Sequence, residues 1–117
     1  MPADKKFPYL EFPAADLDAV ETFYKALFEW SFVSYGDEYR SFSDGNLDGG
    51  FYKSDNQSSY GQGAALVVFY AQDLEATAAA VKEHGGNICR EIFSFPGGRR
   101  FHFRDPHGNE LGVWSDQ

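Results

Sequence analysis

The feature that most constrains the fold is a pattern that occurs twice, once in each half of the chain. Asp16 is followed by Leu17 and a run of helix-forming residues, and Asp73 is followed by Leu74 and a second such run. The two aspartates lie 57 residues apart in a chain of 117 residues. Each is a good helix N-cap, because its carboxylate can accept a hydrogen bond from a free N–H of the first turn. The sequence therefore predicts two similar units in tandem.

Each unit is predicted to consist of one strand, one helix and three further strands. Apolar runs at 7–13 and 65–70 precede the two aspartates. Apolar residues at spacings of three and four continue from Leu17 to Phe28, and Gly85 with Gly86 can end the second helix. The expected fold class is α+β, with two β-α-β-β-β units. The further strands are expected at 31–36, 39–44 and 48–53, and at 87–94, 99–104 and 110–115.

A polar segment at 54–63 separates the two units. Unit one is placed at about 5–53 and unit two at about 64–117. With 43% hydrophobic and 18% aromatic residues the chain can build a core, and its length is that of one ordinary domain. We therefore expect both units to form a single domain, 1–117.

The composition excludes several classes of partner. The net charge is −8, whereas nucleic-acid binding depends on clustered Lys and Arg, so no nucleic acid is expected. The largest basic cluster, Arg99, Arg100 and Arg104, is interpreted as a solvated strand or turn. Cys89 is the single cysteine, and no apolar run approaches the roughly 20 residues that cross a bilayer. We expect no membrane partner and a cytoplasmic location.

Four segments, in this order and at this spacing over the whole length, resemble the vicinal oxygen chelate superfamily. That superfamily includes glyoxalase I, extradiol dioxygenases, and fosfomycin- and bleomycin-resistance proteins. The resemblance implies the glyoxalase-like fold, in which the two units form a curled mixed sheet around a cavity, and it implies a homodimer. The segments are Leu10-Glu11-Phe12-Pro13 with Asp16-Leu17, the run from Glu21 to Trp30, Asp73-Leu74 with Gly85-Gly86, and the run from Phe103 to Glu110.

The resemblance also implies where metal-dependent members would bind a divalent ion. Counting from the N-cap aspartates and from the turn glycines gives Tyr9, Leu66, Gly49 and Gly112. Leucine and glycine offer no side-chain donor, and a neutral tyrosine is a poor ligand. The three histidines do not show the spacing of a replacement site. We therefore expect no metal and no other cofactor.

Strand alternation indicates which side chains would line the cavity. Residues in step with the implied ligand positions are mostly aromatic or acidic, whereas alternate residues such as Leu10, Phe12 and Val113 are apolar and are expected beneath the helices. An apolar, aromatic pocket with a few polar groups is typical of a small-molecule site. The predicted ligand-binding residues are Tyr9, Glu11, Phe51, Leu66, Val68, Tyr70, Glu110 and Trp114.

Glu11 is the candidate catalytic residue. A carboxylate beside Tyr9, Tyr70 and Trp114 in a low-dielectric pocket could act as an acid, a base or a receptor for a cation. The alternative is a solvated carboxylate at the mouth of the cavity, and Glu110 is expected to be more exposed still.

Two functions remain open. The first is a metal-free binding protein, similar to the bleomycin-resistance members, that holds a small aromatic or cationic molecule by stacking and charge. The second is a glyoxalase-like lyase or isomerase in which Glu11 and tyrosine hydroxyls transfer protons. The missing metal ligands favour binding.

Overall fold

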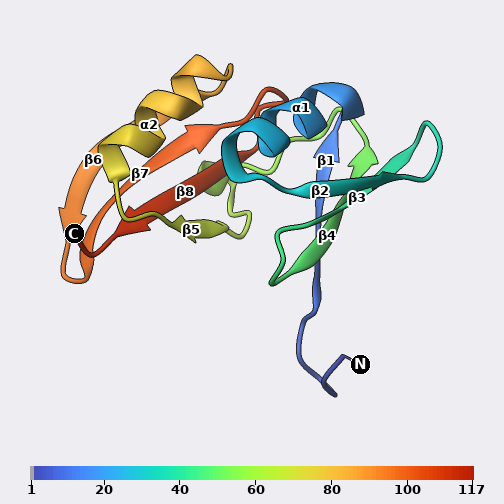
Figure 1. Cartoon of the computed structure of the whole chain (residues 1–117), viewed down its shortest axis with the longest axis horizontal. Coiled ribbons are helices and arrows are strands. Elements are labelled where there is room, and N and C mark those ends of the chain that lie inside the picture. The colour runs from blue at the N-terminus through green and yellow to red at the C-terminus, as the bar shows by residue number, and fades with distance from the viewer. Residues whose placement is uncertain (1) are drawn as a thin grey trace. The chain divides into compact units, whose positions relative to one another are not determined.

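The computed structural model describes residues 2–117, and the chain divides into two compact units. Unit 1 ends at Asn56, and unit 2 runs from Gln57 to Gln117. Each unit contains one four-stranded mixed sheet and one α-helix (Figure 1). The predicted α+β class and the repeated β-α-β-β-β order are confirmed.

Unit 1 follows the predicted order closely. Its first strand begins at Tyr9 rather than at residue 7, and the Asp16 carboxylate caps the helix by accepting a hydrogen bond from the Ala19 N–H at 3.1 Å. The sheet order is β1-β4-β3-β2, with β1 parallel to β4 and the other pairs antiparallel. The elements are β1 (Tyr9–Ala14), α1 (Leu17–Phe28), β2 (Ser31–Ser34), β3 (Tyr39–Ser43) and β4 (Asp48–Lys53).

Aromatic side chains form the core of unit 1 between α1 and one face of its sheet. The Trp30 ring stacks on Tyr24 of α1, with ring centroids 4.4 Å apart, and on Phe42 of β3 at 4.2 Å. Phe51 of β4 is fully buried, and its ring centroid lies 5.6 Å from that of Tyr24 and 5.8 Å from that of Phe12. This face of the sheet is therefore filled, and the opposite face is the one available for a site.

Unit 2 repeats the arrangement. The Asp73 carboxylate accepts from the Ala76 N–H at 3.0 Å, and Gly85 follows the helix with φ +98°, the left-handed conformation that the sequence predicts. The sheet order is β5-β8-β7-β6, with β5 parallel to β8, and α2 contacts β6, β7 and β8. The elements are β5 (Val68–Tyr70), α2 (Leu74–Glu83), β6 (Asn87–Phe95), β7 (Gly98–Arg104) and β8 (Glu110–Ser115).

The segment before β5 packs on unit 2. It contains a short 3-10 helix, Tyr60–Gln62. The Ser58 N–H donates to Asn109 Oδ1 at 2.9 Å, and the Glu110 N–H donates to the Ser58 carbonyl at 2.8 Å. The predicted polar link at 54–63 thus belongs in its second part to unit 2.

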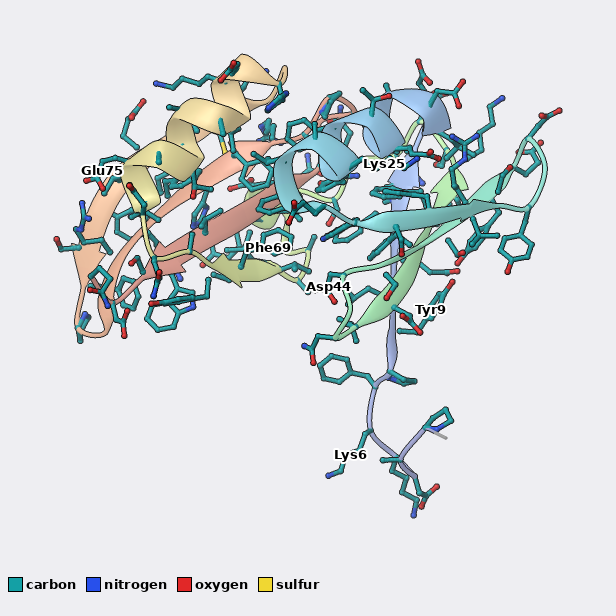
Figure 2. The ribbon with its side chains drawn as sticks, in the orientation of Figure 1. Lys6, Tyr9, Lys25, Asp44, Phe69 and Glu75 are labelled. Atoms are coloured by element: carbon teal, nitrogen blue, oxygen red, sulfur yellow. The ribbon has the colours of Figure 1, made fainter. Side chains whose placement is uncertain are left out.

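Both helices are short and carry charged side chains. Figure 2 shows Lys25 on α1 and Glu75 at the beginning of α2. Within residues 2–117, neither helix has the length and apolar character that a membrane span requires.

Candidate functional site

The face of the unit 1 sheet opposite α1 carries Tyr9 and Glu11. Side chains alternate along β1, so these two lie on the other face from Leu10 and Phe12. The parallel pairing of β1 with β4 sets Tyr9 opposite Asp48 and Glu11 opposite Gly50. The register therefore brings Asp48, which the sequence analysis did not select, to the same face as Tyr9.

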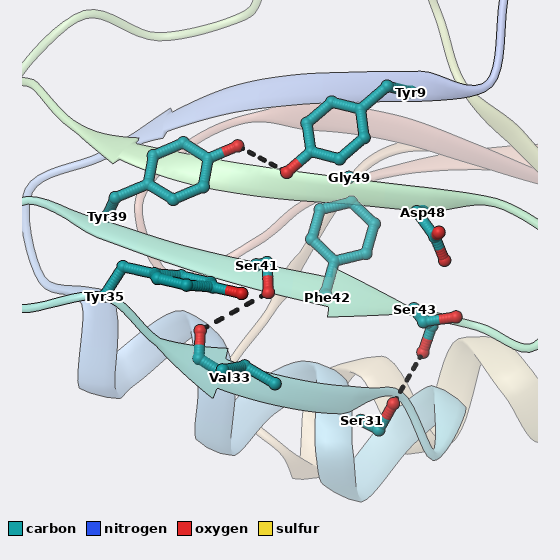
Figure 3. A pocket seen from close by; sticks show the side chains of 10 residues that line it. All are labelled: Tyr9, Ser31, Val33, Tyr35, Tyr39, Ser41, Phe42, Ser43, Asp48 and Gly49. Atoms are coloured by element: carbon teal, nitrogen blue, oxygen red, sulfur yellow. Dashed lines mark hydrogen bonds between the residues drawn. The ribbon is translucent and has the colours of Figure 1, made fainter.

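A pocket of about 580 Å³ lies on this face (Figure 3). That volume is within the range of about 300–1,000 Å³ that small-molecule sites occupy. Three tyrosines line it, Tyr9, Tyr35 and Tyr39, and Asp48 is the charged side chain among the described lining residues. The lining is otherwise apolar or hydroxylic, from Val33, Phe42, Gly49, Ser31, Ser41 and Ser43.

Three side chains form a hydrogen-bonded chain that ends at the pocket. The Tyr39 hydroxyl donates to Glu11 Oε2 at 2.8 Å, and the hydroxyl oxygens of Tyr9 and Tyr39 are 2.7 Å apart. Because Tyr39 has one hydroxyl proton and gives it to Glu11, Tyr9 must donate to Tyr39. Desolvation, and then the hydrogen bonds to Tyr9 and Glu11, raise the pKa of Tyr39 well above its ordinary value, so this phenol stays protonated.

Gly50 is what allows Tyr39 to reach Glu11. The sheet order places β4 between β3 and β1, so the Tyr39 side chain must cross β4. A Cβ at Gly50 would overlap the Tyr39 hydroxyl and ring. The absence of a side chain at this position therefore shapes the wall of the pocket.

The prediction that Phe51 lines the cavity is wrong. Phe51 pairs with Phe12 across β1 and β4, and both face α1. The sequence count from Gly45 gave Gly49 as the position in step with Tyr9, but Gly49 pairs with Leu10. The turn of unit 1 lacks the Asp-Pro pair of the turn at 105–108, so a count taken from its glycine falls one residue short.

The Glu11 carboxylate lies in a solvated environment. Glu11 is exposed rather than enclosed in an apolar pocket, and its carboxylate accepts the Tyr39 hydrogen bond beside the pocket. Of the two environments considered for it, the solvated carboxylate is the one found. Its catalytic role stays a prediction.

In unit 2, four of the predicted residues share the face opposite α2. Val68 lies opposite Gly112 and Tyr70 opposite Trp114 in the pairing of β5 with β8. The ring centroids of Tyr70 and Trp114 are 5.1 Å apart. Leu66 Cδ2 lies 3.5 Å from the place of a Cβ at Gly112, and so joins the same face. Ligand binding by these residues stays a prediction.

The expectation that Glu110 is highly exposed is wrong, and its partner is a histidine that the sequence left unassigned. Glu110 is 8% exposed and His102 is 1% exposed. His102 Nδ1 lies 3.0 Å from Glu110 Oε2, while His102 Nε2 is buried without a hydrogen-bond partner in residues 2–117. His102 pairs with Gly112 across β7 and β8, so it also lies on the face opposite α2. The hairpin turn at 105–109 is the sequence signal that could have predicted this pair. Counting outward from the turn pairs Arg104 with Glu110, and strand alternation places His102 on the same face as these two residues.

The Glu110 carboxylate is held in its charged form. Burial alone would raise the pKa of Glu110, but the hydrogen bonds from His102 and the Tyr60 N–H, with the nearby Arg104, lower the pKa below its ordinary value. A charged carboxylate favours the tautomer in which His102 Nδ1 carries the proton. The Nε2 lone pair is then the free acceptor of this pair.

The sequence model of the Glyoxalase/Bleomycin resistance protein/Dioxygenase superfamily matches residues 6–113. The chain belongs to this superfamily. This match confirms the resemblance that the repeat and the four segments indicate. The match covers nearly the whole chain. No curated protein matches the chain significantly.

Solved structures of superfamily proteins share the fold. A fosfomycin resistance protein, FosX, from Listeria monocytogenes has a TM-score of 0.79 at 15% identity, over 97% of this chain and 94% of that chain. A lactoylglutathione lyase from Agrobacterium tumefaciens has a TM-score of 0.71 at 20% identity, over 97% and 96%. A glyoxalase/bleomycin resistance protein from Albidiferax ferrireducens T118 has a TM-score of 0.71 at 22% identity, over 93% and 97%. At these identities the likeness establishes the fold alone.

The donor set of this superfamily member does not fit a divalent metal. The corrected register gives glycine at both last-strand positions, Gly50 and Gly112, and the first strands offer Tyr9 and Leu66. Glu110 is already bonded to His102. Within residues 2–117 no three His, Cys, Asp or Glu side chains lie close enough together to hold a metal ion. No chemical step is therefore assigned to a metal.

Proposed function

We propose that the protein binds a small aromatic molecule with a cationic group in the pocket of unit 1. The observation that carries the proposal is the composition of that pocket, three tyrosines and one aspartate around a volume of about 580 Å³. Tyr35 and Val33 leave 66% and 55% of their surfaces exposed. Clustered exposed apolar side chains mark interaction sites more often than isolated ones do.

The energetics favour a ring with a positive charge. Ring stacking on tyrosine contributes about 0.5–1.5 kcal/mol beyond the buried area, and a cation over a ring contributes about 0.5–2 kcal/mol. Asp48 is exposed, so its attraction for an ammonium group is screened and adds less. The net charge of −8 further attracts cations at long range.

Calorimetric titration with two probes of equal size tests the proposal. Phenethylamine carries ring and charge, whereas phenethyl alcohol carries the ring alone. The amine is expected to bind more tightly than the alcohol. Equal affinities for the two probes, or no saturable binding of the amine, would contradict the proposal.

Variants then separate stacking from charge. Asp48→Asn should weaken the amine about threefold and leave the alcohol unchanged, whereas Asp55→Asn, with the same change in net charge outside the pocket, should affect neither. Tyr35→Ala should weaken both probes by about threefold to tenfold. Its matched control, Tyr52→Ala, removes a tyrosine from the same face that does not line the pocket.

One observation favours the second function, an isomerase or lyase. The chain from Tyr9 through Tyr39 to Glu11 could relay a proton from a molecule in the pocket, each hydroxyl accepting one proton and passing its own onward. The substrate would lose a proton and the Glu11 carboxylate would gain one, so the step balances. Glu11 would then be the final acceptor, and Tyr9 would contact the substrate.

Exchange of substrate protons for solvent deuterium tests this function. Hydroxyacetone incubated with the protein in D2O should show catalysed exchange at the carbon beside its carbonyl, followed by NMR. Glu11→Gln should abolish the exchange, and Glu29→Gln should not. Catalysis at undiminished rate by Glu11→Gln would exclude the relay.

A homodimer and a cytoplasmic location remain predictions from the sequence.

A further inference from the structure

Unit 2 contains a pocket of its own, of about 330 Å³, on the face of its sheet opposite α2. It is lined by Val68, Phe95, Gly97, Arg100 and Trp114. The ring centroids of Phe95 and Trp114 are 6.4 Å apart, so aromatic surface dominates the walls. Arg100 is the charged side chain among the described lining residues.

Arg100 lies on this face because of strand alternation. It pairs with Trp114 across β7 and β8, and its neighbour Arg99 points to the other face, where it binds Glu75 of α2 at 2.6 Å. The sequence predicts that both arginines are solvated. The structure separates them into one neutralised arginine beside the helix and one arginine inside a pocket.

The Arg100 guanidinium has no counter-ion among the described residues. Arg40 and Arg99 are paired with Asp18 and Glu75, at 2.7 and 2.6 Å. In residues 2–117 no carboxylate oxygen lies within 4.0 Å of an Arg100 side-chain nitrogen, the limit for an ion pair. The Arg100 Nε is buried and has no hydrogen-bond partner in these residues. A partly buried cation left unpaired is costly, and an anionic ligand would offset that cost.

Aromatic contacts hold the guanidinium in place. Its Cζ lies 5.1 Å from the ring centroid of Phe93 and 5.6 Å from that of Phe95. Arg90 also stacks on Phe93, with Cζ at 3.7 Å, and adds a second positive charge nearby. A guanidinium that stacks through its flat face keeps its edge N–H groups free, and these match the two oxygens of a carboxylate.

From this geometry we propose that unit 2 binds a small aromatic carboxylate. The ring lies in the pocket against Trp114 and Phe95, and the carboxylate accepts hydrogen bonds from the Arg100 guanidinium. The ligand has the charge opposite to the one proposed for unit 1. The two proposals rest on different residues, so each can fail without the other.

Calorimetric titration of the full chain with benzoate and benzamide tests the site. We expect saturable binding of benzoate and at least about tenfold weaker binding of benzamide. Arg100→Gln should weaken benzoate about tenfold or more. Arg99→Gln is the matched control, with the same change in charge one residue away, and should leave benzoate binding within about twofold of the wild type.

Two further variants keep the test decisive. Should Arg100→Gln lower the melting temperature, Arg100→Lys, which keeps the charge but not the paired N–H edge, should still weaken benzoate more than benzamide. Asp48→Asn should leave benzoate unaffected, which separates this site from the pocket of unit 1. The proposal is overturned if benzoate does not saturate the wild type, if it binds Arg100→Gln with wild-type affinity, or if benzamide binds equally well.

Discussion

Replacing Glu110 with glutamine should lower the free energy of unfolding by about 2 kcal/mol, because this buried carboxylate accepts from several donors. His102 Nδ1 lies 3.0 Å from one oxygen, and the Tyr60 N–H donates to the other at 3.3 Å. Glutamine keeps the shape and one acceptor oxygen. Its amide nitrogen is a donor, however, so either the Tyr60 N–H loses its acceptor or His102 must turn to the tautomer in which Nδ1 accepts.

The magnitude follows from burial. A hydrogen bond to a charged group contributes about 1.5–3 kcal/mol, and a buried polar group left unsatisfied costs about 1–3 kcal/mol. Glutamine removes the charge from both bonds but retains one of them in neutral form, which gives the value of about 2 kcal/mol. Arg104, at 3.5 Å, has 37% of its side chain exposed, so the loss of its attraction adds little.

The pH dependence has a definite sign. The pKa of Glu110 is lower in the folded protein than its ordinary value of 4.5. A carboxylate with a depressed folded pKa stabilises the fold above its unfolded pKa, and this stabilisation is lost as the pH falls through the folded pKa. The difference between the wild type and Glu110→Gln should therefore be complete near neutral pH and should shrink progressively below about pH 4.5.

Urea unfolding followed by circular dichroism measures both effects. Glu91→Gln, at an exposed position on β6, is the control for the change in charge and should stay within about 0.5 kcal/mol of the wild type. The reasoning is refuted if Glu110→Gln also stays within about 0.5 kcal/mol at neutral pH. A difference that does not decrease in acid would show that the carboxylate charge is not its source.

Four other predictions can be tested with the purified protein and its variants. Phe51→Ala should cost about 3–5 kcal/mol in urea unfolding and Tyr52→Ala, at a residue 37% exposed, less than about 1 kcal/mol; similar losses would mean that Phe51 is not in the core. Gly50→Ala should displace Tyr39 and cost about 1–3 kcal/mol, whereas Gly112→Ala meets ordinary contacts from 3.5 Å and should stay within about 1 kcal/mol of the wild type. Elemental analysis of purified protein should find no stoichiometric Ni, Zn, Mn or Fe, and an ion that resists mild chelation would contradict the donor-set argument. Sedimentation at micromolar concentration should show a dimer, and a monomer would refute that expectation.

The repeat and its helices could be predicted because they depend on local rules. Asp16 and Asp73 begin their helices where the sequence indicates, and both carboxylates make the expected cap. The apolar spacing of three and four from Leu17 to Phe28 matches the bounds of α1. Such features depend on neighbours within a few residues, which one sequence contains in full.

The register of unit 1 could not be counted from its turn glycine. In unit 2, Asp105 Oδ1 accepts from three consecutive N–H groups, those of His107, Gly108 and Asn109. In unit 1, Asp44 Oδ1 accepts from Asn46 and Leu47 only, among the described bonds, and the turn differs in length. Because side chains alternate along a strand, one residue of difference moved Phe51 to the wrong face.

The surroundings of Arg100 could not be predicted, for another reason. Arg100 meets Phe93 and Phe95 across a strand pair whose register shifts twice between Ile88 and Phe93. Those irregularities have no clear sequence signal. The absence of a counter-ion for Arg100 within residues 2–117 is a property of all the elements around it, so no local pattern could indicate it.

The two units use equivalent glycines in different ways, and the strand order explains the difference. Gly50 pairs with Glu11, five residues before the cap Asp16, and Gly112 pairs with Val68, five residues before Asp73. In unit 1 the ring and its carboxylate, Tyr39 and Glu11, stand on β3 and β1 with β4 between them, so the ring must cross Gly50. In unit 2, His102 and Glu110 stand on the adjacent strands β7 and β8, and the ring reaches its carboxylate without crossing Gly112. A side chain at Gly50 is therefore excluded by Tyr39, whereas Gly112 leaves space beside His102 that an alanine could fill.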